Sequence, residues 1–225
     1  MFNIYNMAGA IACAKHFGIK DDDIKSGLEK IEFIRGRMEK VDMGQNFDVV
    51  VDYAHTPDSL QAIYEAFAPR LTAKTVGAPT SSQEKNTPKK LICILGNTGG
   101  GRDTWKRPEM AKIADEYCDH IIFTNEDPYD EDPMKIINEM KVAVKNKPYE
   151  IILDRRAAIA SAISQASHFA KASRDDQNKV AVLITGKGTD PYIMGPNGSK
   201  QEWDDAKVVR EELQKIIESQ NNLKQ

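Results

Sequence analysis

Polar loops that could carry chemistry each follow a short apolar segment. In residues 52–58 (DYAHTPD), Asp52 could accept a hydrogen bond from a ribose hydroxyl, and His55 could orient a phosphate or a metal-bound water. Residues 96–103 (GNTGGGRD) form a glycine-rich loop whose backbone can approach a ligand closely. Basic side chains in and after this loop could hold carboxylate or phosphate oxygens: Arg102, Lys106 and Arg107. The plainer alternatives are a helix cap at Thr56 or Asp58, with Pro57 in the first turn, and a tight glycine turn.

Two further loops are rich in charge. Residues 124–133 hold five acidic side chains and could recognise a cationic amine, or could be a solvated loop that starts a helix. Residues 185–190 (TGKGTD) place a lysine between two glycines and end at Asp190. Either Gly188 only turns the chain, or Asp190 faces the same cleft as the acidic loop.

Short segments rich in Val, Ile and Leu alternate with longer amphipathic stretches from residue 47 onward. The alternation predicts a Rossmann-like α/β fold, with a mostly parallel sheet and helices on both faces. Ligands bind such sheets at the carboxyl ends of the strands. The expected strands are 47–53, 91–95, 120–124, 150–153 and 180–185, with a hairpin around 192–203. The expected helices are 58–68, 106–118, 133–145, 155–172 and 204–218.

The first residues read differently. Residues 3–18 and 21–31 predict a helical pair that turns at Gly18, and two helices cannot bury a core by themselves. Residues 72–90 read as a mobile surface loop, and residues 219–225 read as a frayed tail.

Composition excludes several classes of protein. The chain has 225 residues, with 31 basic and 34 acidic residues, a net charge of −3 and 40% hydrophobic residues. This composition is typical of a soluble globular protein and excludes a strongly basic nucleic-acid binder. No apolar run approaches the roughly 18 residues of a membrane span. Three scattered cysteines predict reduced, buried thiols in a cytoplasmic protein, and four scattered histidines predict no metal site.

Taken in order, the motifs resemble the C-terminal domain of the Mur ligases, and within that family the ligases that add the third residue to UDP-N-acetylmuramoyl-dipeptide. The resemblance spans almost the whole chain and rests on NIYNMAGA at 3–10, GRME at 36–39, VDYAHTPD at 51–58, the loop 96–108, DP at 127–128 with DEDP at 130–133, and GKG at 186–188. One such motif is weak evidence; six in order are strong.

The resemblance implies an ATP-dependent reaction in peptidoglycan biosynthesis. A substrate carboxylate is phosphorylated, and the amine of an incoming amino acid attacks the acyl phosphate. Residues 1–36 would be a helical remnant of the central ATPase domain, and residues 37–225 the amino-acid-binding domain. The ATP contacts implied are Asn3, Asn6, Arg37, Asp52 and His55. The amino-acid contacts implied are Arg102, Asp127, Tyr129, Gly186 and Asp190, with Arg102 on a carboxylate and the acids on an amine.

Two departures from the family pattern bear on the substrate. Members that add diaminopimelate carry Asp-Asn-Pro-Arg, where the Arg grips a carboxylate; here the aligned residues are EDPY, with Tyr129 in place of the Arg. The family's Gly-Lys-Gly-His-Glu is GKGTD here, which keeps the acid but not the imidazole. These changes favour a lysine-like acceptor over diaminopimelate.

The family's P-loop, its main Mg²⁺ ligands and its UDP-sugar domain have no counterpart in the sequence. The resemblance implies ATP and Mg²⁺ as cofactors. Because the parts that hold most of their contacts have no counterpart here, we expect no turnover by the chain alone. No residue in the sequence is a convincing general base. The N-terminal helices should expose an apolar face that favours self-association or a companion chain. Two other hypotheses stay open: a related folate or cyanophycin-type ligase, and a free-standing domain that binds an amino acid or a protein without catalysis.

Overall fold

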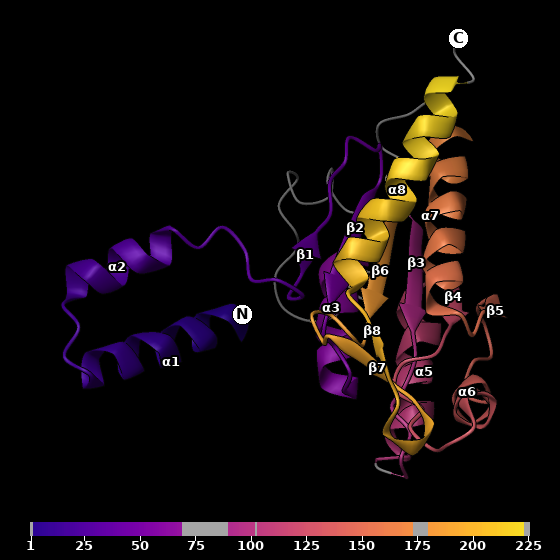
Figure 1. Cartoon of the computed structure of the whole chain (residues 1–225), viewed down its shortest axis with the longest axis horizontal. Helices are drawn as coiled ribbons and strands as arrows, with labels where there is room; N and C mark the ends of the chain where they lie inside the picture. Colours follow the sequence, from indigo (N-terminus) through magenta and orange to yellow (C-terminus); the bar gives the residue numbers. More distant parts are fainter. Residues whose placement is uncertain (1, 69–89, 102, 173–179, 223–225) are drawn as a thin grey trace. The chain divides into compact units, whose positions relative to one another are not determined.

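The computed structural model describes residues 2–68, 90–101, 103–172 and 180–222. The chain divides into two compact units, Met1–Ile34 and Arg35–Gln225 (Figure 1). No helix within the described ranges combines the length and the apolar character that crossing a membrane requires.

The first unit is the predicted helical pair. Helix α1 (Phe2–His16) and helix α2 (Asp21–Glu29) are joined by a turn in which Gly18 has a φ of +75°, a conformation that glycine adopts without strain. Large apolar side chains of this unit are exposed, among them Tyr5 (74%) and Phe17 (80%). The unit therefore has no buried core of its own.

The second unit is built on a six-stranded sheet in the order β1-β2-β6-β3-β4-β5. All neighbouring strands are parallel except β1, which runs antiparallel to β2. The strands are β1 (Glu39–Lys40), β2 (Asp48–Asp52), β3 (Lys90–Leu95), β4 (His120–Phe123), β5 (Tyr149–Ile151) and β6 (Val180–Thr185). The five parallel strands confirm the predicted ones. Strand β1 was not predicted, because its two residues are too few to show a hydrophobic pattern.

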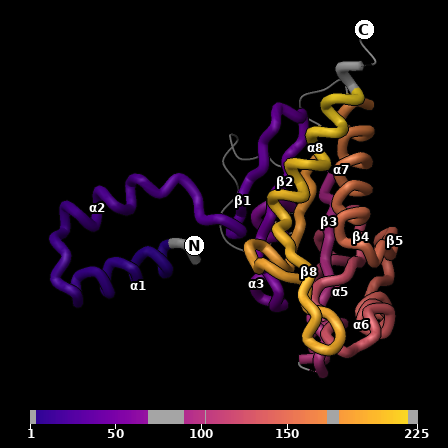
Figure 2. Tube along the Cα trace, in the orientation of Figure 1, coloured from indigo at the N-terminus to yellow at the C-terminus, as the bar shows by residue number. Residues whose placement is uncertain are grey.

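Helices cover both faces of the sheet, as the alternation predicted (Figures 1 and 2). Helices α3 (Pro57–Phe67), α5 (Lys106–Tyr117) and α6 (Pro133–Lys141) pack on the face that includes Val50. Helices α7 (Arg155–Ala172) and α8 (Asp205–Asn222) pack on the opposite face, which includes Val49 and Val51. Successive strand residues point to opposite faces, so each strand is apolar on both sides.

Some boundaries differ from the predictions. Helix α6 ends at Lys141 rather than near residue 145, because the backbone N–H groups of Lys145, Asn146 and Lys147 donate to the Asp115 carboxylate instead of continuing the helix. The predicted tail from residue 219 is wrong as far as Asn222, where α8 ends. The late hairpin is present as β7 (Tyr192–Met194) and β8 (Lys200–Glu202). The loop predicted at 72–90 lies outside the described residues, except for Lys90, which begins β3.

The cysteines correct the prediction of reduced, buried thiols. Cys93 and Cys118 are buried but joined in a disulfide, and Cys13 is exposed. Cys93 lies in β3 and Cys118 follows α5, which packs on that strand. Their separation of 25 residues in the sequence gave no sign of this proximity.

Candidate functional site

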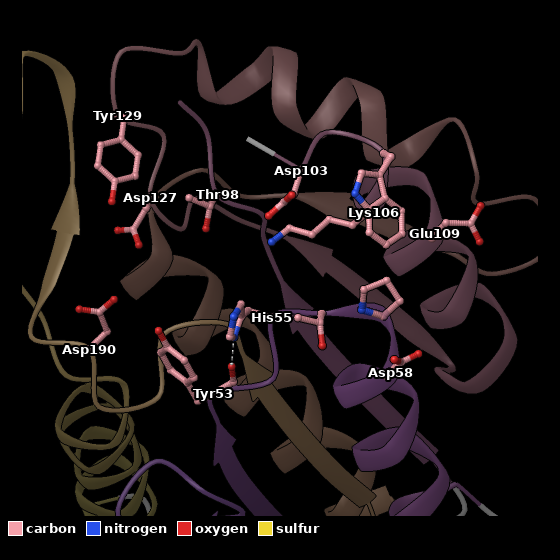
Figure 3. A pocket seen from close by; sticks show the side chains of 13 residues that line it. Tyr53, His55, Asp58, Thr98, Asp103, Lys106, Glu109, Asp127, Tyr129 and Asp190 are labelled. Carbon is pink, nitrogen blue, oxygen red and sulfur yellow. Dashed lines mark hydrogen bonds between the residues drawn. The ribbon is translucent and has the colours of Figure 1, made fainter. Parts of the chain in front are cut away.

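A cleft of about 620 Å³ lies at the carboxyl ends of the parallel strands (Figure 3). The sheet order places β6 between β2 and β3, with β4 beyond β3, so the loops after these four strands are neighbours. All four loops contribute to the lining: Tyr53, His55, Thr56, Pro57, Asp58, Thr98, Asp103, Trp105, Lys106, Glu109, Asp127, Tyr129 and Asp190.

The loop after β2 is shaped by its own polar groups. The two carboxylate oxygens of Asp52 accept hydrogen bonds from the backbone N–H groups of Met38 (2.7 Å) and Ala54 (2.8 Å). Burial raises the pKa of Asp52, and these two hydrogen bonds oppose that rise. Thr56 and Ser59 then form a capping box that starts α3, as the predicted Thr cap required.

His55 presents one ring nitrogen to the cleft. Its Nδ1 lies 2.9 Å from the carbonyl oxygen of Tyr53, and a carbonyl can only accept, so Nδ1 carries the proton (Figure 3). Its Nε2 is the ring nitrogen that is left for a ligand. The guanidinium of the exposed Arg37 stacks over the Tyr53 ring, with its Cζ 4.8 Å from the ring centroid.

The loops after β3 and β4 are held against each other. The Gly99 N–H donates to the Asp127 carbonyl (2.7 Å), and a Cβ on Gly99 would overlap the carbonyl oxygen of Pro128. The fully buried Arg107 donates to the carboxylates of Glu131 and Glu139. The hydrogen bond from Arg107 lowers the pKa of Glu131 to about 2. Arg107 is therefore a structural tie between the loops.

A buried lysine brings two acidic loops together. The Lys187 ammonium donates to both oxygens of Asp127 (2.8 Å each) and to Asp190 (2.9 Å). The Lys187 side chain is 1% exposed, whereas the Asp190 side chain is 34% exposed. One ammonium between two carboxylates leaves a net negative charge that faces the cleft, which suits a ligand with a cationic amine.

Behind this cluster lies a second buried carboxyl. The Glu126 side chain accepts from Thr98 Oγ1 (3.0 Å) through one oxygen, while its other oxygen has no hydrogen-bond partner in the described part of the chain. Burial raises the pKa of Glu126. Gly186 packs against this carboxyl with a φ of +107°, and a Cβ there would overlap it. Gly186 therefore makes room for Glu126 rather than lining the cleft.

The predicted contacts are distributed unevenly. His55, Asp127, Tyr129 and Asp190 line the cleft, whereas Asp52 and Gly186 support its loops. Asn3 and Asn6 lie in α1, in the other unit, and Arg102 lies outside the described residues.

The role of Lys187 was missed. The sequence Gly186-Lys187-Gly188 indicates a loop after a strand, but it does not indicate that the lysine side chain is buried. Trp105 was missed too, as a 65% exposed aromatic at the cleft. Within the described ranges, no three potential metal ligands gather.

Comparisons with known proteins identify relatives of this chain. The family described as Mur ligase, glutamate ligase domain, matches residues 36–188. The UDP-N-acetylmuramoyl-L-alanyl-D-glutamate–2,6-diaminopimelate ligase of Syntrophomonas wolfei is 40% identical over 216 residues, which are 95% of this chain and 38% of the relative. The ligase of the same name from Oceanobacillus iheyensis is 37% identical over 213 residues, 93% of this chain and 37% of the relative. The chain thus spans under two fifths of these relatives.

Solved structures show the same fold. A 2,6-diaminopimelate ligase of the same name superposes with a TM-score of 0.63 at 28% identity, covering 96% of this chain and 39% of the other. The Mycobacterium tuberculosis folylpolyglutamate synthase complexed with ADP gives a TM-score of 0.52 at 16% identity, covering 77% and 34%, and shows only a shared fold. Because the family match covers more than half of its residues, the chain belongs to the Mur ligase family.

Proposed function

We propose that this chain is the amino-acid-binding part of an ATP-dependent ligase that adds a diamino acid to UDP-N-acetylmuramoyl-L-alanyl-D-glutamate. The observation that carries the proposal is the Asp127–Lys187–Asp190 cluster at the meeting point of the strand-end loops. The names of the relatives support the same reaction class.

The charge of the cleft supports a cationic amino acid. Five acidic residues and one lysine line it: Asp58, Asp103, Glu109, Asp127, Asp190 and Lys106. A diamino acid with one carboxylate carries a net positive charge at neutral pH and complements this lining. Diaminopimelate carries a second carboxylate and has no net charge, so it gains less from the same lining.

Tyr129 adds a second argument for a lysine-like acceptor. It lines the cleft, and by the resemblance of the motif it stands in place of the arginine of family members that add diaminopimelate. A tyrosine cannot form the bidentate bonds with which a guanidinium holds a carboxylate. Its φ of +51° is rare for a bulky side chain, which indicates that the loop fixes this residue at some cost.

In the proposed reaction, ATP phosphorylates the free carboxylate of the dipeptide and leaves as ADP. The amine nitrogen of the incoming amino acid then bonds to the acyl carbon, the bond from that carbon to the phosphate oxygen breaks, and the amine loses a proton. The Asp127–Lys187–Asp190 cluster would hold an amine of the amino acid in place for this attack.

The ATP contacts remain proposals, and the residues differ in how well they fit. The exposed Arg37 guanidinium and the Nε2 of His55 are available to a nucleotide, whereas both oxygens of Asp52 already accept backbone hydrogen bonds. Asn3 and Asn6, in the helical unit, are proposed as ATP contacts from the sequence resemblance alone. Mg²⁺ would supply charge neutralisation to the phosphates, and the described residues offer it no ligand cluster.

Association of the N-terminal helices is also part of the proposal. Their large exposed side chains, such as Tyr5 and Phe17, favour burial against a companion chain, a second copy or other parts of a longer protein.

The test is ADP release by the complete ligase with ATP and the UDP-linked dipeptide, in the presence of L-lysine or diaminopimelate. We expect a higher kcat/KM for lysine, and we expect Tyr129→Arg to shift the preference toward diaminopimelate, with Tyr129→Phe as the matched control. A clear preference of the unsubstituted enzyme for diaminopimelate contradicts the lysine assignment. No ADP release with either amino acid contradicts the ligase assignment.

A further inference from the structure

Lys106 is a buried cation without an internal partner. The residue is 7% exposed, it opens α5, and it lines the cleft. Among the residues that the structure describes, its ammonium makes no ion pair within 4.0 Å and no hydrogen bond. Figure 3 shows its side chain extending into the cleft, toward the side on which Thr98 and His55 lie.

The other buried cations among the described residues of this unit are bound to carboxylates. Arg107 pairs with Glu131 and Glu139, Arg155 pairs with Asp205, and Lys187 pairs with Asp127 and Asp190. This pattern follows because burying an unpaired charge costs free energy, which pairing with a carboxylate offsets. Lys106 departs from this pattern, since no carboxylate of the described residues forms an ion pair with its ammonium.

Neither the neighbouring acids nor the helix backbone takes the place of that partner. Asp58, Asp103 and Glu109 line the same cleft, but none of them forms an ion pair with Lys106. At the start of α5 the backbone N–H groups of residues 106 and 107 donate to the carbonyls of residues 103 and 104, and residue 108 is a proline without an N–H. The Lys106 ammonium is therefore the donor that this end of the helix offers to a ligand.

We infer that Lys106 binds an oxyanion of the substrates, a carboxylate or phosphoryl oxygen, inside the cleft. The acidic pair Asp127 and Asp190 lies across the cleft from Lys106 (Figure 3). An amino acid could thus place its amine at the acidic pair and its carboxylate at Lys106, or Lys106 could meet the phosphoryl group of the activated dipeptide. The identity of the oxyanion rests on the proposed function, whereas its place beside Lys106 rests on the geometry of the cleft.

Calorimetric titration of the full 225-residue chain tests this inference with three probes: L-lysine, 1,5-diaminopentane, which lacks the carboxylate, and inorganic phosphate. The variant is Lys106→Met, which keeps the aliphatic stem. Lys106→Arg restores the charge, and the exposed Lys112→Met on the same helix is the matched control. Circular dichroism and Tm establish that each variant is folded.

If the oxyanion is the carboxylate, Lys106→Met weakens L-lysine binding about tenfold or more and leaves diaminopentane binding unchanged. If it is the phosphoryl group, the variant loses phosphate binding and keeps L-lysine binding. In either case Lys106→Arg retains most of the affinity, and Lys112→Met has no effect.

Equal affinities of the unsubstituted chain and Lys106→Met for both anionic probes overturn the inference, as does the absence of binding of either probe to the unsubstituted chain. These outcomes are separate from the ligase assignment. A chain that binds through Lys106 but whose complete enzyme releases no ADP refutes the proposed function alone, whereas an active enzyme that is indifferent to Lys106 refutes the inference alone.

Discussion

The buried Arg155–Asp205 pair gives the sharpest prediction about stability. Arg155 donates through Nε and one terminal nitrogen to the two oxygens of Asp205 (2.8 Å each), and both side chains are 0% exposed. Arg155 also donates to the backbone carbonyls of Thr185 (2.8 Å) and Asn125 (3.3 Å). Those carbonyls immediately precede Gly186 and Glu126, so one arginine ties the loops after β4 and β6 to helix α8.

Replacing Arg155 by Met should destabilise the protein strongly. The change leaves the Asp205 carboxylate buried with only the Trp203 indole N–H as a partner, and breaking such a pair costs about 3–5 kcal/mol. A domain of this size is stable by about 5–15 kcal/mol, so the loss is a large share of the total. At about 2–4 °C per kcal/mol, we expect Tm to fall by roughly 10 °C.

Arg156 provides the matched control because it bridges the same two helices at the surface. It pairs with Glu211 and Glu212, but its side chain is 41% exposed. Solvent screening limits such pairs to about 0.2–1 kcal/mol. Urea unfolding followed by circular dichroism should therefore separate Arg155→Met from Arg156→Met by at least about 2 kcal/mol.

A second variant isolates the buried charge. Adding Asp205→Asn to Arg155→Met removes the unpaired carboxylate and keeps the oxygen that accepts from Trp203, so part of the stability should return. Equal stabilities of the two single arginine variants, or a further loss in the double variant, would refute the reasoning.

Two further predictions concern the loops of the cleft. Because Arg107 lowers the folded-state pKa of Glu131 from its ordinary value of 4.5 to about 2, the stabilisation of the protein by this pair is present above pH 4.5 and is lost as the pH falls through 2. The Tm difference between the protein and Glu131→Gln should shrink across that range, and a constant difference contradicts the assignment. In urea unfolding, Gly186→Ala should lower the free energy of unfolding by about 1–3 kcal/mol more than Gly198→Ala does. Both glycines have a positive φ, but only at Gly186 would a Cβ displace a neighbour, Glu126. Equal losses in the two variants would contradict this steric role of Gly186.

Much of the fold follows from patterns that are local in the chain. Val49, Val50 and Val51 form a continuous apolar run that indicates a strand covered on both faces, and Thr56-Pro57-Asp58 marks the start of a helix. Each loop with chemistry could thus be placed after its strand. The end of α6 could not be predicted, because the backbone N–H groups of residues 145–147 that follow it donate to the Asp115 carboxylate, about 30 residues away in the sequence.

The sequence by itself determined the strands, most of the helices and the polar loops, because hydrophobic periodicity and capping act over a few residues. Tertiary structure decided which side chains meet. Insertion of β6 between β2 and β3 brings Lys187 to Asp127. Packing of α5 on β3 brings Cys93 to Cys118, and it leaves Lys106 in the cleft without a partner among the described residues. Burial and pairing of charges depend on strand order and on contacts between distant residues, and no local pattern in a single sequence specifies either.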